Sequence, residues 1–166
     1  MTVAVRGVSS PGPDQAGVAS EPFRALAAQH AALRGEFARL IAAPPSEVRH
    51  PAVSALVVNL ARSLERHLCI EETAVYPICE RLFGGREGAT NVLRGEHSSM
   101  RAQLGRLAQP VLHDGAAWRL GFESLRLSVD YHFGREERVL FPMAWALLSE
   151  PERSALARRL SAFPGR

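Results

Sequence analysis

Apolar residues recur along this chain at alternating intervals of three and four residues, the spacing of one face of an α-helix. Four stretches carry this pattern, over residues 26–40, 60–78, 93–111 and 122–143. The buried stripe of the last stretch is predicted to end with Val139 and Met143. A shorter amphipathic segment with Leu156 and Leu160 follows them. No stretch alternates apolar and polar residues as a half-buried strand would. The pattern predicts an all-α protein, an up-down-up-down four-helix bundle with a short C-terminal fifth helix.

Turn-forming residues separate these stretches. Pro44-Pro45, Gly84-Gly85 and Asp114-Gly115 stand between successive apolar patterns, and Asp114 is a candidate N-cap for the fourth helix. Ser149 and Glu152 have the spacing of a capping box, which predicts where the fifth helix begins.

Six polar residues interrupt the apolar stripes at positions that should face the core. They are His30, His67, Glu71, His97, His132 and Glu136. Burying an imidazole or a carboxylate without a partner costs about 2–7 kcal/mol, and more for a charged form. A domain with a net stability of about 5–15 kcal/mol could not carry six such groups unpaired. They must satisfy one another or share a metal ion, which would remove the penalty for all of them together.

Two of the stripes contain the same motif. Residues 67–77 and 132–142 both read HxxxEE, followed by an aromatic residue and a proline. Residues four apart lie on one face of a helix, so each motif aims an imidazole and a carboxylate at one point. Gln29-His30 and Glu96-His97 repeat in the same register, which indicates a duplicated helical hairpin. Pro77 and Pro142 are expected to kink or break their helices.

The donor types indicate which metal fits. The set contains nitrogen and oxygen but no thiolate, and it divides into two histidines per ion with both glutamates bridging. Such a site suits iron, ahead of manganese and zinc. The remaining histidines, His50 and His113, lie beside turn residues outside any stripe and are interpreted as surface or helix-end residues.

Composition limits the class of protein. The chain has 166 residues, 46% of them hydrophobic, which is enough for one domain; we assign residues 20–163 to it and residues 1–19 to a flexible tail. No apolar run is long enough to span a membrane. The net charge of +3 comes without a run of five like charges, which argues against nucleic-acid binding. Cys69 and Cys79 lie about 15 Å apart on one predicted helix, too far for a disulfide, so we expect a cytoplasmic protein.

The ligand order H…HxxxE…H…HxxxE resembles that of bacterial hemerythrin-like proteins with HHE domains. The resemblance covers roughly residues 20–148 and includes the HxxxEE…P continuation. It implies a hemerythrin-like bundle that holds two iron ions in a bridged centre, with an oxo or hydroxo group completing the bridge. On this resemblance one ion is bound by His30 and His67, the other by His97 and His132, and both are bridged by Glu71 and Glu136.

One position departs from the oxygen-carrying hemerythrins, which have a second histidine four residues after the first on the third helix. Here that position is Arg101, so one ion would lose a nitrogen ligand and gain an open or solvent-filled position. The departure argues against reversible oxygen carriage and leaves room for nitric oxide binding, peroxide reaction or sensing. Arg34 stands at the equivalent place on the first helix, and we expect both arginines to pair with glutamates at the bundle edge.

Residues next to the ligands receive structural interpretations. Glu72 and Glu137 lie about 100° around the helix from the bridging glutamates, which favours surface or arginine-paired roles over metal ligation. Tyr76 and Tyr131 are interpreted as packing residues, with a hydrogen bond near the site or a phenolate ligand as the alternative.

Several functions remain open on this pattern. The first is a non-haem di-iron protein that binds or senses dioxygen, nitric oxide or peroxide and acts in iron or redox homeostasis. A second is a di-iron enzyme with catalase-like peroxide-disproportionating or oxidase activity. A third is a helical interaction module with a structural metal. A ferritin-like oxidase or iron store ranks low, because such bundles typically use Glu-x-x-His pairs and more carboxylates than histidines. The sequence identifies no protein partner.

Overall fold

The computed structural model describes residues 21–42, 50–85, 88–107 and 115–163, and every regular element in these ranges is helical. The elements are α1 Glu21–Ala42, α2 Pro51–Ile70, η3 Glu71–Val75, α3 Tyr76–Leu82, α4 Ala89–Leu107, α5 Gly115–Arg135, η4 Glu136–Leu140, α6 Phe141–Leu147 and α7 Glu150–Ser161. Here η denotes a π-helical turn, and α2–η3–α3 and α5–η4–α6 each form one continuous rod. The predicted tail, the Pro44-Pro45 boundary and the Asp114 cap lie outside the described residues.

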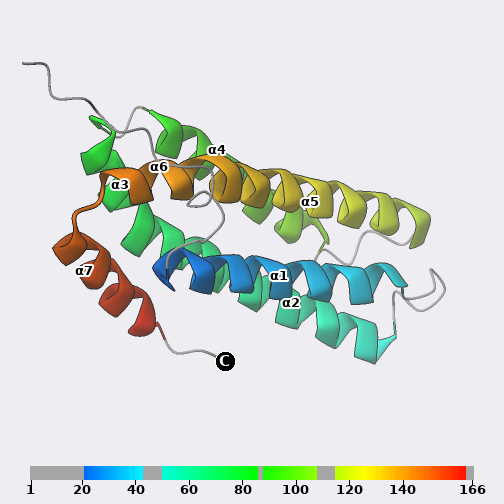
Figure 1. The fold of residues 1–166 in the computed structure, drawn as a ribbon. Coiled ribbons are helices and arrows are strands. Elements are labelled where there is room, and N and C mark those ends of the chain that lie inside the picture. Colours follow the sequence, from blue (N-terminus) through cyan, green and yellow to red (C-terminus); the bar gives the residue numbers. More distant parts are fainter. Residues whose placement is uncertain (1–20, 43–49, 86–87, 108–114, 164–166) are drawn as a thin grey trace, which may run out of the picture.

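The four rods form the expected bundle. In Figure 1, α1 and α2 lie side by side, α5 and α6 run along the opposite edge, and successive rods alternate in direction. α1 packs on α2 and α5, while α4 packs on α5 and α2. The short α7 folds back against α1 and η3 at the end where α6 finishes. The all-α four-helix architecture with a fifth helix is therefore confirmed.

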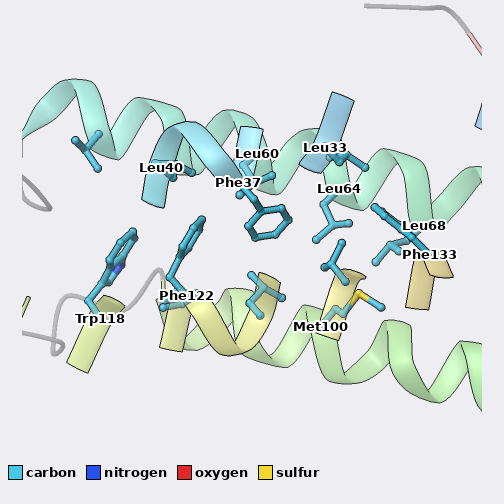
Figure 2. Close-up of a cluster of buried hydrophobic side chains, with 14 residues drawn as sticks. Leu33, Phe37, Leu40, Leu60, Leu64, Leu68, Met100, Trp118, Phe122 and Phe133 are labelled. Atoms are coloured by element: carbon cyan, nitrogen blue, oxygen red, sulfur yellow. The ribbon is translucent and has the colours of Figure 1, made fainter. Parts of the chain in front are cut away.

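Two apolar clusters fill the bundle, one on each side of a polar layer. The Phe122 cluster contains Leu33, Phe37, Leu64 and Met100 among others, and Figure 2 shows its labelled aromatic rings pointing into the space between the helices. The Phe141 cluster, at the α7 end, contains Leu26, Leu93 and Leu140 among others. Each rod contributes to both clusters. The buried histidines and glutamates of the rods lie at the boundary between the two contributions, so they divide the core as a polar layer.

A π turn follows each HxxxE motif and changes the register beyond it. The backbone N–H of Tyr76 donates to the carbonyl of Glu71, five residues back, and Phe141 N–H donates to Glu136 in the same way. Pro77 is the second residue after the first of these turns. A proline ring crowds the carbonyl four residues before it, which here belongs to Thr73 inside the widened turn. The prolines therefore do not break the rods.

The extra residue in each π turn corrects two sequence-based assignments. Val139 and Met143, predicted to continue the buried stripe of the fourth helix, are 53% and 51% exposed. Leu140 and Phe141 are buried instead. The prediction was wrong because it extended the 3.6-residue period through a turn with a longer period.

Features at the helix ends agree with the sequence. Gly84 and Gly85 have φ of 84° and 135°, which glycine adopts without a steric penalty, so the chain turns there as predicted. The capping box between Ser149 and Glu152 is formed at the start of α7.

Cys69 is exposed and Cys79 is buried, and both are free thiols. None of the described helices is long and apolar enough to cross a membrane.

Candidate metal centre

The six stripe residues meet in the polar layer. Each is buried, with an exposed fraction of 2% or less, although they come from all four rods. His67 Nε2 lies 2.8 Å from Glu71 Oε1, and His97 Nε2 lies 3.3 Å from the other oxygen of that carboxylate. Glu136 Oε2 lies 3.4 Å from His30 Nε2 and 3.6 Å from His132 Nε2. Both carboxylates therefore stand between histidines of different helices.

The ligand atoms divide into two groups that share one carboxylate. The first is formed by His30, His67, Glu71 and Glu136, and the second by Glu71, His97 and His132, with the ligand atoms of each within 4.8 Å of one another. The sequence-based pairing of His30 with His67 and of His97 with His132 matches this division. The role of these six residues as metal ligands stays a prediction.

All four imidazole rings are oriented in the same sense. Every Nε2 points into the cluster, while every Nδ1 is 2.7–2.8 Å from an oxygen outside it. The four acceptors are Glu137 for His30, Gln29 for His67, Glu72 for His97 and Glu96 for His132. A carboxylate or amide oxygen only accepts, so each Nδ1 carries the hydrogen. This is the arrangement by which outer hydrogen bonds fix the orientation of metal-binding histidines.

Several inward-facing atoms lack a hydrogen bond. Among the described residues, His67 Nε2 and one oxygen each of Glu71 and Glu136 are buried polar atoms without a hydrogen-bond partner. In addition, His97 Nε2 and His132 Nε2 lie only 2.9 Å apart. With hydrogens on both Nδ1 atoms, the two nitrogens would face each other lone pair to lone pair unless a proton or a cation stands beside them. Imidazole binds an ion such as zinc at about 2.0–2.1 Å, so two adjacent nitrogens on one ion lie about 3 Å apart. The donor set fits a cation.

The raised pKa values of two histidines indicate that protons on their rings stabilise the cluster when no ion is bound. Burial opposes a charged His30 ring, but hydrogen bonds and charges from Glu136 and Glu71 outweigh it and raise the pKa of His30 to about 9. Burial likewise opposes a charged His132, yet Glu71, Glu96 and Glu136 raise its pKa to about 10. Protons on these rings occupy positions that a cation could take.

The two central carboxylates shift in opposite directions. Burial disfavours an ionised Glu71, but the charge of His67 and hydrogen bonds from His132 and His30 hold its pKa well below the usual range. For Glu136, burial and then the negative charge of Glu71 raise the pKa. Two carboxylates so close together cannot both ionise freely without a compensating cation.

Tyr76 has a larger part in the site than the sequence indicated. It was interpreted as a packing residue, but its ring is fully buried and its hydroxyl donates to Glu136 Oε1 at 2.9 Å. The Tyr76 hydroxyl oxygen also lies 2.9 Å from His97 Nε2. Burial raises the pKa of this phenol, and the charges of Glu71 and Glu136 raise it further. The π turn brings Tyr76 onto the face of Glu71, which explains why the helical period missed it. Tyr131, by contrast, is 62% exposed.

Aromatic rings enclose the other end of the site. His30 stacks on Phe133 with ring centroids 3.8 Å apart and faces Phe141 at 5.9 Å. Phe141 occupies the position in the second motif that Tyr76 occupies in the first. The two halves of the site are therefore alike in their histidines but unlike in this neighbour, which is apolar on one side and carries a hydroxyl on the other.

The arginines pair with glutamates, as expected. Arg34 donates to Glu137 at 2.8 Å, and Arg101 donates to Glu72 at the same distance and to Glu65. Glu72 and Glu137 thus connect a histidine to an arginine at the bundle edge, and the arginine-paired interpretation of both glutamates is confirmed.

A helical bundle with a buried layer of histidines and carboxylates defines a class of metal-binding proteins. Residues 21–144 match the family model described as the hemerythrin HHE cation-binding domain, and the chain belongs to that family. Together the family and the buried His/Glu groups indicate a metal-binding site. Comparison with curated proteins and with solved structures gives no match.

Proposed function

We propose that the chain is a non-haem di-iron protein that binds or senses a small oxidant. The observation that supports this best is the common orientation of the four histidines, with each Nδ1 fixed outward and each Nε2 directed inward. His30 and His67 would hold one ion, His97 and His132 the other, and Glu71 and Glu136 would stand between them. A set of nitrogen and oxygen donors without sulfur favours iron over zinc, with manganese as the remaining alternative.

We expect a free coordination position for an external ligand beside α4, the third helix of the bundle. Arg101 points to Glu65 and Glu72, so the position four residues after His97 supplies no donor to the centre. An ion held there by His97 and His132 would keep a coordination position for dioxygen, nitric oxide or a peroxide. Iron in such a position would supply reversible binding or one-electron chemistry, while the residues of this chain would orient the ligands and the two apolar clusters would keep bulk water out.

Metal content tests the proposal directly. Protein purified without added metal should contain about two iron ions per chain, with near-ultraviolet bands from an oxo bridge. His67→Ala and His132→Ala should each lower the iron content. His50→Ala is the matched control. His50 is an exposed histidine at the start of α2, where its side chain accepts a hydrogen bond from Ala52 N–H, and it does not belong to the buried polar layer. Protein that stays folded without metal, and whose melting temperature a chelator leaves unchanged, would contradict the proposal and favour a helical interaction module.

A second candidate function is supported by Tyr76. Its hydroxyl lies between His97 Nε2 and Glu136 Oε1, so an O–H group is held beside the atoms that would bind the second ion. Peroxide disproportionation, in which two peroxides give two waters and one dioxygen, needs protons moved at such a place. Steady oxygen release from peroxide without loss of iron, slowed in Tyr76→Phe, would establish the enzyme. Binding of nitric oxide or oxygen without turnover would favour the sensor.

The cellular location and partners remain predictions. A cytoplasmic location rests on the two free cysteines. The argument against nucleic acid rests on the interspersed charges: Arg34, Arg101, Arg126 and Arg135, for example, each pair with a carboxylate.

A further inference from the structure

The two hairpins differ in the group that holds one histidine of each pair. His67 Nδ1 donates to Gln29 Oε1 at 2.8 Å, whereas His132 Nδ1 donates to Glu96 Oε2 at 2.8 Å. Gln29 and Glu96 are corresponding residues of the internal repeat, since each directly precedes the first histidine of its hairpin. The remaining two histidines are matched, because His30 and His97 both donate to glutamates. Among the four Nδ1 hydrogen bonds, only those of His67 and His132 therefore differ in the type of acceptor.

A second difference accompanies the first. The other carboxylate oxygen of Glu96, Oε1, accepts a hydrogen bond from the guanidinium group of Arg135, with which Glu96 forms an ion pair. The residue that corresponds to Arg135 in the first motif is Ile70, which is buried in the Phe141 cluster. One hairpin thus has a carboxylate with its arginine, and the other has a neutral amide with an apolar residue. Because both residues differ together between the hairpins, the charged Glu96 has an arginine partner and the neutral Gln29 needs none.

We propose that Gln29 and Glu96 make the two ion positions unequal, so that the His97–His132 position binds its ion more tightly and loads first. The inference rests on the proposed function, since it assumes that both histidine pairs bind metal. A carboxylate that accepts the Nδ1 hydrogen increases the electron donation of the imidazole to the ion more than an amide oxygen does. Changes in such outer partners alter metal affinity by about 10–100-fold. Gln29 and Glu96 act through His67 and His132 and are positioning residues.

Tyr76 acts in the same direction. Its hydroxyl lies beside His97 and Glu136, on the side of the more tightly binding position, while Phe141 places an apolar ring beside His30. The contribution of Gln29 and Glu96 must therefore be separated from that of Tyr76. Substitutions at the two positioning residues leave Tyr76 untouched, so they isolate the effect of the outer hydrogen bonds.

The test is an anaerobic titration of metal-free protein with Fe(II) in wild type and variants. Isothermal calorimetry measures the heat of binding and gives the binding constants. Wild type should show two binding constants that differ by about 10-fold or more. Glu96→Gln should weaken the tighter constant by about 10–100-fold, and Gln29→Glu should strengthen the weaker one. His132→Ala should remove the tighter constant and His67→Ala the weaker, which assigns each constant to a position. A merely structural role for Gln29 would not make Gln29→Glu bind iron more strongly.

Gln103→Glu is the matched control. It makes the same chemical change on α4, at a residue that hydrogen-bonds to serines away from the polar layer, and should leave both constants unchanged. Equal constants in wild type, or a weaker constant that does not rise in Gln29→Glu, would overturn the inference while leaving a two-ion centre in place. Failure of wild type to bind iron at all would instead contradict the proposed function.

Discussion

Stability of protein stripped of ions should fall as the pH rises from 6.5 to 9. The pKa of His30 lies at about 9 in the folded protein against 6.5 for an ordinary histidine. A group whose pKa is raised by folding contributes stability that is fully present below its unfolded pKa. That stability is lost as the pH rises through the folded pKa. The ring faces Glu71, Glu136 and Glu137, and these carboxylates favour its protonated form.

The magnitude follows from the shift. One pKa unit corresponds to about 1.4 kcal/mol, so the loss from His30 alone is about 3 kcal/mol across this interval. His132, with a pKa of about 10, adds a loss of the same sign that continues to higher pH. Glu136 also has a raised pKa and loses stability in the same direction above its unfolded value of 4.5. Against a typical total of about 5–15 kcal/mol, the combined effect is large.

Urea unfolding measures the effect, with circular dichroism as the readout and a strong chelator present at pH 6.5, 7.5 and 9. The free energy of unfolding should decline steadily with pH, and the decline should be smaller in His30→Gln. His50→Ala should keep the full decline. A free energy that is constant or rises over this interval would refute the assignment of buried protons to the histidine cluster.

Iron should reverse the sign of this dependence. An ion must displace the protons on His30 and His132, so binding releases protons and the apparent affinity rises with pH. Protein saturated with Fe(II) should therefore gain stability over chelated protein, and the gain should be greater at pH 7.5 than at pH 6.5. An equal gain at both values would show that no proton leaves the cluster.

Three further predictions concern the framework around the centre. In chelated protein, Tyr76→Phe should lower the free energy of unfolding by about 1–3 kcal/mol, because the buried carboxylate of Glu136 loses its donor; an unchanged urea midpoint would contradict this hydrogen bond. Leu140→Ala should cost about 2–5 kcal/mol and Met143→Ala less than about 0.5 kcal/mol, and the reverse order in urea unfolding would disprove the π-shifted register. Ser149→Ala should cost about 0.5–2 kcal/mol through loss of the α7 cap, measured as a lower melting temperature, and an unaltered melting curve would show that α7 does not need the cap.

The architecture and the composition of the polar layer could be predicted from the sequence because both depend on helical periodicity. Glu71 begins the π turn, but its backbone N–H still donates to the carbonyl of His67 as in a regular helix, so the i, i+4 rule places the two side chains on one face. The cost of burying such groups then indicates that they meet. The repeat of the motif in the second hairpin supports the same conclusion independently.

Other parts of the site could not be predicted from the 3.6-residue helical period. Tyr76 and Phe141 reach the core through π turns, and a turn with one extra residue rotates every later side chain. Gln29 and Glu96 lie outside the apolar stripes and contact histidines of another helix, so their role depends on packing between rods. The internal repeat could have indicated these positions. Gln29 and Glu96 stand at the same offset from a predicted ligand in the two hairpins, and so do Tyr76 and Phe141.

The hydrogen bonds of His30 and His97 have an evolutionary consequence. His30, in the first hairpin, donates to Glu137 of the second, while His97, in the second, donates to Glu72 of the first. Neither hairpin contains the acceptor that its own leading histidine needs. A single hairpin of this kind could therefore complete a site only by associating with another copy, and a chain that holds both hairpins makes that association independent of concentration. Substitution at Glu72 is constrained by a histidine in the other half, so the two halves cannot diverge independently.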